Sequence, residues 1–415
     1  MSGSPGIAST EPLAPKGVWL NRNVAGMGLT SLLSDAGHEM ATVILPGFLA
    51  VLGVSAAALG TVEGVADSVS SFVKLGAGWF SDRLGHRKPI TVGGYFLTGV
   101  STSLFAFASG WPLVLIGRTV GWFGRGIRGP LRDAMLASSV SPEARGKAFG
   151  FHRAGDTVGA VIGPLAAVGL LSCFHARTHD AAAPFRIIFL LTLIPGLGSG
   201  VVFAALVREK RGAPSPRAFW ASLQDLPPSF RRCLWGIGVF GMGDFARTLM
   251  ILAATQLLTP AWGVGHAAQI AGLLYVGHNL VYAACSYPAG ALSDRFGRHG
   301  LLALGYLAGA LTSAGLAAAF LCRLRLTLYL LLLFVTAGFC IAVVDALEKA
   351  LTADLVPDDR LRGTAYGMLG TVNGVGDLLA SVLVGLLWTA FSPWVAFCYA
   401  AVLMAAGATV IYQVR

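Results

Sequence analysis

Long apolar stretches follow one another along almost the whole chain, separated by short polar segments. About 20 apolar residues suffice to cross the hydrocarbon core of a membrane as a helix. Lipid forces the backbone to satisfy its own hydrogen bonds, so only helices and closed barrels cross it, and the alternating pattern of barrel strands is absent. The sequence therefore predicts an all-α integral membrane protein with twelve transmembrane helices. We expect these spans at about 25–50, 56–80, 89–109, 111–138, 146–172, 185–207, 231–257, 267–292, 300–321, 326–353, 363–388 and 393–413.

Composition agrees with a membrane protein and narrows its possible functions. Of the 415 residues, 55% are hydrophobic and 12% are charged, whereas an ordinary soluble domain is about one-quarter charged. The net charge of +10 comes largely from basic residues in short loops between spans, so nucleic-acid binding is not expected. The six cysteines form no CxxC pair, which predicts neither a metal site nor a disulfide framework. No phosphate-binding loop of the GxxxxGK type occurs, so we expect no cofactor and a proton gradient as driving force.

The distribution of Lys and Arg predicts the orientation in the membrane. With the N-terminus inside, eighteen basic residues lie in cytoplasmic segments, against only Arg177, Arg186, Arg323 and Arg325 on the other side. Basic residues favour cytoplasmic loops, so both termini are expected in the cytoplasm. The first 24 residues lack the basic segment and apolar core of a signal peptide and are expected to form a cytoplasmic tail. A bacterial cytoplasmic (inner) membrane is the expected location.

The chain contains an internal repeat. The segment "GWFSDRLG" after the second span matches "GALSDRFG" after the eighth, and residues 132–150 match residues 348–367. The longest polar connection lies between the two copies. We therefore expect a tail at 1–24, a six-helix bundle at 25–207, a cytoplasmic loop at 208–230 and a second, pseudo-symmetric six-helix bundle at 231–415.

With these features the chain resembles the major facilitator superfamily over essentially its whole length. Gly78, Asp82, Arg83 and Gly85 match that family's loop signature between spans two and three, with His86 where Arg is usual. The resemblance implies a loop that latches the two bundles and releases as they rock; a loop that only fixes orientation is the alternative. The expected gating residues are Gly78, Asp82, Arg83, Gly85, Arg87, Gly290, Asp294, Arg295, Gly297, Arg298, Asp133, Arg145, Glu348 and Arg362.

Charged residues inside the spans are candidates for substrate binding. In span four, Arg118, Arg125, Arg128 and Arg132 recur at spacings of seven, three and four, which is one face of a helix. A charge facing lipid is costly, so these groups must face a wet cavity or an acid on a neighbouring helix. The expected cavity residues are His38, Arg125, Arg128, Asp244, Arg247, His278, Asn279 and Asp377, with Asp244 and Arg247 on one face of span seven. Fixed ion pairs with neighbouring acids are the alternative.

Acidic residues in the first two spans are candidates for proton coupling. Asp35, His38 and Glu39 share a helix face in span one, and Glu63 and Asp67 lie one turn apart in span two. Carboxyl groups within a membrane are functional candidates by default, because they can bind and release a proton in each transport cycle. We assign proton coupling to the four acids, with fixed salt bridges to the arginines as the alternative.

Span five contains a glycine pattern that is similar to the antiporter motif of the same family. Gly150, Gly159, Gly163 and Pro164 match it, although the paired glycines after the proline are replaced. The resemblance implies exchange of substrate for protons, and close helix packing alone is the alternative. His152, Arg153 and Asp156 on this span are candidates for gating or binding.

These observations predict a secondary active transporter, working as a monomer in the lipid bilayer by alternating access. Proton-coupled export of a drug or metabolite is favoured. The arginines of span four suggest an anionic or zwitterionic small molecule, and proton-driven uptake of an anionic metabolite or siderophore-like chelate is the alternative. An integral-membrane transferase is a remote alternative, since the histidines are dispersed and no nucleophile–base pair is evident.

Overall fold

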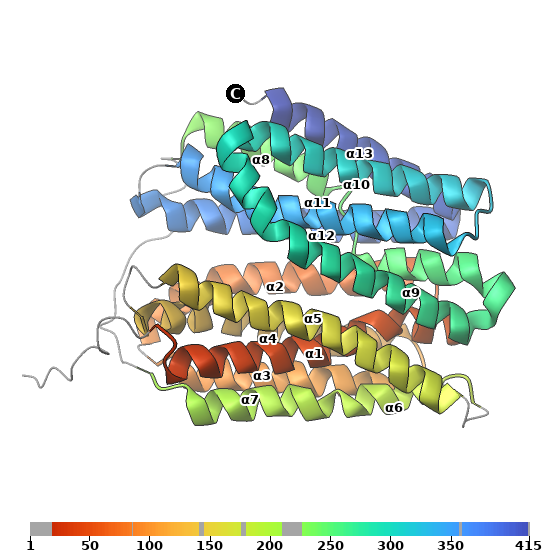
Figure 1. Ribbon diagram of the computed structural model, residues 1–415, viewed down its shortest axis with the longest axis horizontal. Coiled ribbons are helices and arrows are strands. Elements are labelled where there is room, and N and C mark those ends of the chain that lie inside the picture. The colour runs from red at the N-terminus through yellow and green to blue at the C-terminus, as the bar shows by residue number, and fades with distance from the viewer. Residues whose placement is uncertain are drawn as a thin grey trace, which may run out of the picture.

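The protein consists of helices that run roughly side by side, as Figure 1 shows. This computed structural model describes residues 19–84, 86–140, 145–175, 180–209, 226–356 and 359–413. Within these ranges there is no strand, and eight stretches are long and apolar enough to cross a membrane. The expected all-α membrane fold is confirmed.

In the described residues, the first bundle contains seven α-helices and one short 3-10 helix. They are α1 (Arg22–Val51), α2 (Ala56–Leu84), α3 (Lys88–Ser103), the 3-10 helix η1 (Leu104–Phe107), α4 (Trp111–Ser138), α5 (Arg145–His175), α6 (Ala183–Leu191) and α7 (Leu193–Leu206). Helix α1 packs along α5 and α7, and α4 packs along α2 and α3. The expected sixth span is divided into α6 and α7 at Thr192. Pro195 has no backbone N–H to bond the carbonyl of Leu191, so the helix is interrupted there.

The second bundle contains α8 to α13. They are α8 (Pro228–Gly241), α9 (Arg247–Phe296), α10 (Arg298–Leu321), α11 (Thr327–Leu355), α12 (Asp359–Ala390) and α13 (Pro393–Gln413). Helix α10 packs along α11 and α13. Helix α9 consists of two parts that meet at Gly263, where φ is +70° and the chain reverses direction at the right edge of Figure 1.

The expected seventh span is not one continuous helix. Residues 242–246 between α8 and α9 are non-helical. Gly241 and Gly243 flank Met242, and two glycines so close together lower the stability of a helix. The span is therefore completed by the first part of α9, and its second part forms the expected eighth span.

The two bundles meet most extensively along α2 with α12, then along α5 with α9, and α1 contacts α9 to the same extent as α5 does. The first two pairs exchange when the halves of the internal repeat are exchanged. Glycines bring α2 and α12 into backbone contact, because a Cβ at Gly385 would lie 2.6 Å from the carbonyl oxygen of Ala56. Gly60 faces the backbone of Ser381 in the same way.

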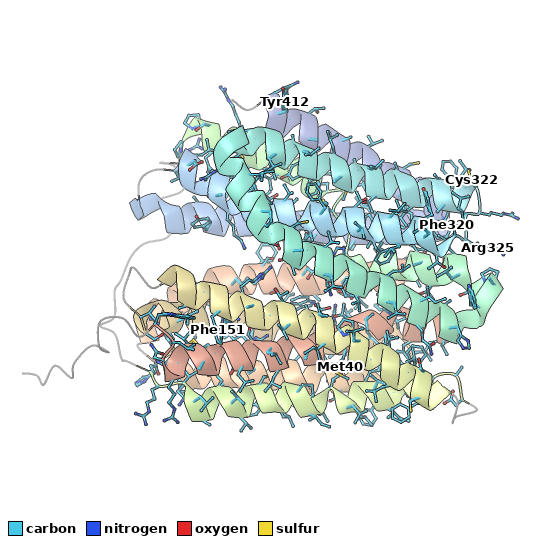
Figure 2. The ribbon with its side chains drawn as sticks, viewed as in Figure 1. Met40, Phe151, Phe320, Cys322, Arg325 and Tyr412 are labelled. Atoms are coloured by element: carbon cyan, nitrogen blue, oxygen red, sulfur yellow. The ribbon has the colours of Figure 1, made fainter. Side chains whose placement is uncertain are left out.

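The apolar core differs between the two ends of the molecule. We call the end where α1 begins and α13 finishes the termini end, and the opposite end, where Figure 2 shows Cys322 and Arg325, the far end. In the far half a single core joins both bundles, with Phe48 from α1 and Phe397 from α13. Toward the termini end each bundle has its own core, one around Phe203 and one around Phe230. The bundles are therefore packed together at the far end and separated toward the termini end.

Replacing Gly163 by Val should destabilise the first bundle. A Cβ at Gly163 would lie 2.5 Å from the carbonyl oxygen of Ala36, so a larger side chain must force α5 away from α1. Overpacking of this kind costs about 1–3 kcal/mol. The melting temperature of the purified protein in detergent should fall by several degrees.

The matched control is Gly169→Val on the same helix, where a Cβ meets no atom within 4 Å. Its melting temperature should stay close to that of the unchanged protein. Equal melting temperatures for the two variants would contradict the close packing of α5 on α1.

Candidate functional site

A cavity of about 320 Å³ lies between the bundles, halfway along the helices. Its walls are formed by α1, α2, α4 and α5 from the first bundle and by both parts of α9 from the second. We call it the central cavity. Of the expected proton-coupling residues it contains Asp35, Glu39, Glu63 and Asp67. Of the expected substrate residues it contains His38, Arg125, Arg247, His278 and Asn279.

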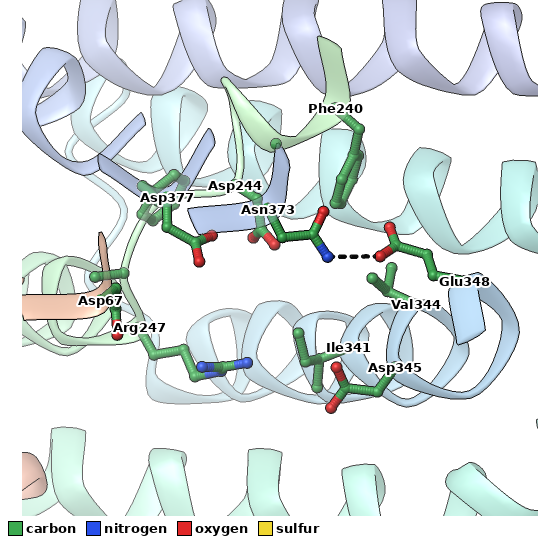
Figure 3. Close-up of a pocket in the computed structure, with 13 residues that line it drawn as sticks. Asp67, Phe240, Asp244, Arg247, Ile341, Val344, Asp345, Glu348, Asn373 and Asp377 are labelled. Carbon is green, nitrogen blue, oxygen red and sulfur yellow. Dashed lines mark hydrogen bonds between the residues drawn. The ribbon is translucent and has the colours of Figure 1, made fainter. Parts of the chain in front are cut away.

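A second space of about 160 Å³ adjoins the central cavity on the side of the second bundle. Asp67, Ala246 and Arg247 line both spaces, so the two are neighbours with a shared wall. Its charged lining consists of five acids and one arginine: Asp67, Asp244, Asp345, Glu348, Asp377 and Arg247 (Figure 3). We call it the acidic pocket. Asp377 and Asp244, both expected in the cavity, lie here.

Arg118 of α4 forms a buried ion pair with Glu63 of α2. The Nη2–Oε2 distance is 3.0 Å, and the two side chains are 5% and 2% exposed. Arg118 Nη1 also donates to the hydroxyl of Thr42 at 3.2 Å. One arginine of span four is thus neutralised by a neighbouring helix, as the alternative interpretation expects.

Arg125 pairs with Asp35 of α1, with Nη2 to Oδ1 at 2.6 Å, but these side chains are 25% and 12% exposed, so this pair is open to the cavity. Between Arg118 and Arg125 lies the ring of Trp122, whose centroid is 5.5 and 5.1 Å from the two guanidinium carbons. The ring of His38 packs edge-on against Trp122 at 5.1 Å. Two ion pairs in the wall of the first bundle therefore flank one aromatic ring.

Two hydrogen bonds connect the bundles across the central cavity. Tyr275 of α9 donates its hydroxyl to Glu39 of α1 at 3.0 Å. Asn279 donates to the carbonyl oxygen of Ala160 in α5 at 2.9 Å. His278 is turned to its own bundle, where Nδ1 lies 3.3 Å from the carbonyl oxygen of Phe334.

A charged contact also joins the bundles on the side toward the termini end. Arg153 of α5 lies 3.8 Å from Asp345 of α11, which accepts a hydrogen bond from Tyr282 at 2.7 Å. Arg153 also approaches Asp156 at 3.9 Å, and Ser31 donates to Asp156. Opening the bundles further at the termini end must break the contact between Arg153 and Asp345.

Glu348 of α11 lies in the acidic pocket. It is 3% exposed, and its two oxygens accept from the Tyr306 hydroxyl at 2.7 Å and from the Asn373 amide at 2.8 Å (Figure 3). In this structure Glu348 is bonded within its own bundle, and its expected part as a gating partner of the second loop stays a prediction. Arg298 of that loop instead pairs with Asp354 at 2.8 Å and donates to the carbonyl oxygen of Ala350.

Asp244 and Arg247 do not share a helix face, in contrast to expectation. Asp244 lies in the non-helical segment 242–246, whereas Arg247 is the first residue of α9. No hydrogen bond or ion pair joins their side chains to each other. Both still line the acidic pocket.

Arg128 lies outside both cavities, which corrects the expectation that it faces substrate. It is 2% exposed, and its guanidinium carbon stacks 4.0 Å from the ring centroid of Tyr95 in α3. Three residues along a helix correspond to about 300°, so Arg128 is rotated by about 60° from Arg125 and reaches α3 instead of the cavity. Arg132 pairs with its neighbour Asp133 at 2.9 Å.

The expected gating residues are only partly visible. Gly85 and the side chains of Asp82, Arg83, Arg145, Asp294, Arg295 and Arg362 lie outside the described parts; Gly78, Gly290 and Gly297 belong to or flank the described helices. The backbone N–H groups of Arg87 and Lys88 donate to the carboxylate of Glu209, the latter at 3.2 Å. This carboxylate lies at the N-terminus of α3, where a negative charge is favourable. Glu209 and Asp354 were not predicted from the sequence, although both are acids at the ends of spans.

The three glycines of the antiporter-like motif lie in two different environments. Gly159 and Gly163 face α1, where added Cβ atoms would lie 2.5 Å from the carbonyl oxygens of Leu32 and Ala36. Gly150 meets no atom within 4 Å, and Pro164 lies inside α5. Close packing accounts for two of the three glycines. Their part in exchange stays a prediction.

The comparisons with known proteins agree over nearly the whole chain. The profile of the Major Facilitator Superfamily matches residues 27–266 and 236–415. An uncharacterized MFS-type transporter of Methanocaldococcus jannaschii is 31% identical over 388 residues, 92% of each chain. A multidrug resistance protein B homolog of Mycobacterium tuberculosis is 27% identical over 252 residues, 60% of this chain and 45% of that one. In fold, the chain is similar to a bacterial homolog of the human lysosomal transporter Spinster, with a TM-score of 0.71, 16% identity and 96% coverage of both chains.

Replacing Arg118 by Met should destabilise the protein strongly, because the carboxylate of Glu63 would stay buried without a cation. Removing one partner of a buried pair costs roughly 3–5 kcal/mol, whereas replacing both partners by apolar groups is often neutral. The double variant Arg118→Met with Glu63→Met should therefore melt at a higher temperature than Arg118→Met alone.

Arg153→Met serves as the control, because the Arg153 side chain is 55% exposed and its melting temperature should change little. The assignment fails if Arg118→Met melts like the unchanged protein, or if the double variant is less stable than the single one. Detergent-solubilised protein and a thiol-reactive or intrinsic fluorescence signal suffice for the measurement.

Proposed function

This chain is a transporter of the Major Facilitator Superfamily, and we propose that it exports a small molecule in exchange for protons by alternating access. The observation that carries the proposal is the position of Glu39. This intramembrane carboxyl group accepts its hydrogen bond from Tyr275 of the opposite bundle, at 3.0 Å. No described cation forms an ion pair with it. Protonation of this carboxyl group is thus linked to the arrangement of the two bundles.

Alternating access is supported by the uneven packing of the two ends. A continuous apolar core closes the far end, whereas the two bundles have separate cores toward the termini end. With both termini in the cytoplasm, as the basic loops predict, this arrangement is the inward-open state. The outward-open state requires the seam between α2 and α12 to part at the far end.

Proton coupling is supported by two carboxyl groups one turn apart on α1. Asp35 pairs with Arg125 inside the first bundle, and Glu39 bonds across to the second. A proton on Asp35 would release Arg125, and a proton on Glu39 would change the contact between bundles. Rocking and proton binding then influence each other reciprocally, as coupling between two sites requires.

Export is favoured by two observations. A relative of this chain is named multidrug resistance protein B homolog, and α5 carries three glycines and the proline of the antiporter-like motif. The central cavity, of about 320 Å³, falls within the size range of small-molecule sites, and the adjoining acidic pocket adds about 160 Å³.

Neutralising Asp35 or Glu39 should abolish transport driven by a pH gradient while leaving the fold intact. We expect Asp35→Asn and Glu39→Gln to lose gradient-dependent flux at least tenfold in proteoliposomes offered a panel of anions, cations and drugs. Passive exchange of the same compounds should persist, because the cavity is unchanged in shape.

Asp180→Asn is the control for this experiment, since Asp180 is exposed and bonds only to the backbone of Ala182. Coupling that is unchanged in both single variants and in the double variant would refute the assignment. Melting temperatures of all variants separate loss of coupling from loss of folding.

Gly60→Val should shift the protein away from the arrangement described here. Gly60 faces the backbone of Ser381 across the seam between bundles, so a Val side chain cannot fit while the far end is closed. Spin labels at the exposed far-end positions Ser55 and Arg325 should report a longer distance in this variant. Gly76→Val on the same helix meets no atom within 4 Å and should leave the distances unchanged. Identical distance distributions in the two variants would count against a seam that opens.

A further inference from the structure

The charges around the two cavities are unequally compensated. Arg118 and Arg125, which seemed suited to hold an anion, are already paired with Glu63 and Asp35. The acidic pocket has five acids and only Arg247 as a cation. The space next to the second bundle therefore carries an excess of negative charge.

Several acceptor atoms of this region have no partner in the described structure. The side chains of Asp67, Asp244 and Asp377 make no hydrogen bond there, and all three line the acidic pocket (Figure 3). Two further atoms on the adjoining wall, Glu63 Oε1 and Thr248 Oγ1, are buried without a partner, on side chains that are about 2% exposed. Buried polar groups are almost always hydrogen-bonded, so Glu63 Oε1 and Thr248 Oγ1 require partners from a bound molecule or water. The three aspartates are half-buried and open to the acidic pocket, where a bound cation can reach them.

The geometry of the acidic pocket does not fit a metal ion. Among the residues that the structure describes, no group of three or more His, Cys, Asp or Glu side chains is placed to hold a metal ion. The carboxylates are spread over α2, the 242–246 segment and α12, around a space that takes an organic group. The wall also includes Phe240 and Phe245, and an aromatic face attracts an organic cation.

We propose that the transported substrate carries a positive charge, and that its ammonium or guanidinium group binds in the acidic pocket between Asp67, Asp244 and Asp377. The N–H groups of such a cation supply the donors that these carboxylates lack. The apolar part of the molecule extends along Phe240, Ile341 and Val344. This inference rests on the proposed function, whose substrate class it names, and it replaces the anionic substrate expected from the sequence.

Substitution of Arg247 tells whether the substrate is cationic or anionic. It lines both cavities and forms no ion pair within the described ranges. An anion would use this guanidinium together with Lys74, which also lines the central cavity, so Arg247→Gln would weaken anion binding. For a cation the same change removes a repulsive charge and should tighten binding several-fold.

The test uses purified protein and equilibrium binding in the absence of any gradient. The probes are 2-phenylethylamine, hexylamine and cyclohexylmethylamine, each compared with the carboxylate and the alcohol of the same carbon skeleton. We expect the amines to bind and their counterparts to bind at least tenfold more weakly. Asp244→Asn and Asp377→Asn should each weaken amine binding at least tenfold, Arg247→Gln should tighten it, and the control Asp180→Asn should change nothing.

Binding only of carboxylates or alcohols, no binding of any amine, or loss of amine binding in Arg247→Gln would overturn the cationic substrate. So would amine binding that survives both aspartate substitutions. The proposed function is tested separately, by movement of the bound amine into proteoliposomes with and without a pH gradient. Binding without gradient-dependent movement would refute proton coupling and leave the cation site standing.

Discussion

The structure depends on the cost of exposing charge to lipid. An ionised side chain at the middle of a membrane is unfavourable by roughly 2.5–3.5 kcal/mol or more, and this chain has many such side chains in its helices. They are accommodated in three ways, one of which is the stacking of Arg128 on the ring of Tyr95. Arg118 and Glu63 neutralise each other, whereas Asp67, Asp244 and Asp377 face a wet space between bundles. The cavity therefore keeps the charged helix faces away from lipid, in addition to offering space for a substrate.

Much of the fold could be predicted from the sequence, because apolar length and the internal repeat are local or repeated signals. All twelve expected spans correspond to helices or pairs of helices. The interruption at 242–246 was not predicted, since two glycines lower helix stability without fixing where a span breaks. The two parts of α9 complete the expected seventh span and form the expected eighth, and they meet where the chain reverses at Gly263.

The sequence predicted many of the residues that line the candidate site, but not which of them pair with one another. Helix periodicity placed Asp35, Glu39 and Arg125 toward the cavity. The same periodicity could not decide whether Arg128 faces the cavity or α3, because that depends on how α4 is rotated against its neighbours. An ion pair between two helices depends on how the helices pack, which the sequence of one helix does not show. The arginines of span four therefore suggested a positively charged cavity, whereas Glu63 and Asp35 neutralise Arg118 and Arg125. The acids of the second bundle, scattered along the sequence, converge only in the folded chain.

The glycine contacts between α2 and α12 have a consequence for the energetics of the cycle. Backbones that touch at Gly60 and Gly385 pack more densely than either would against water, and this close packing is lost when the seam parts. An equally large dry surface must then form at the opposite end, or the carrier would stay in one orientation. The orientation in which the carrier rests therefore depends on the difference in stability between the closed contacts at the two ends. Relatives with bulkier residues at these two positions should rest open to the other side of the membrane.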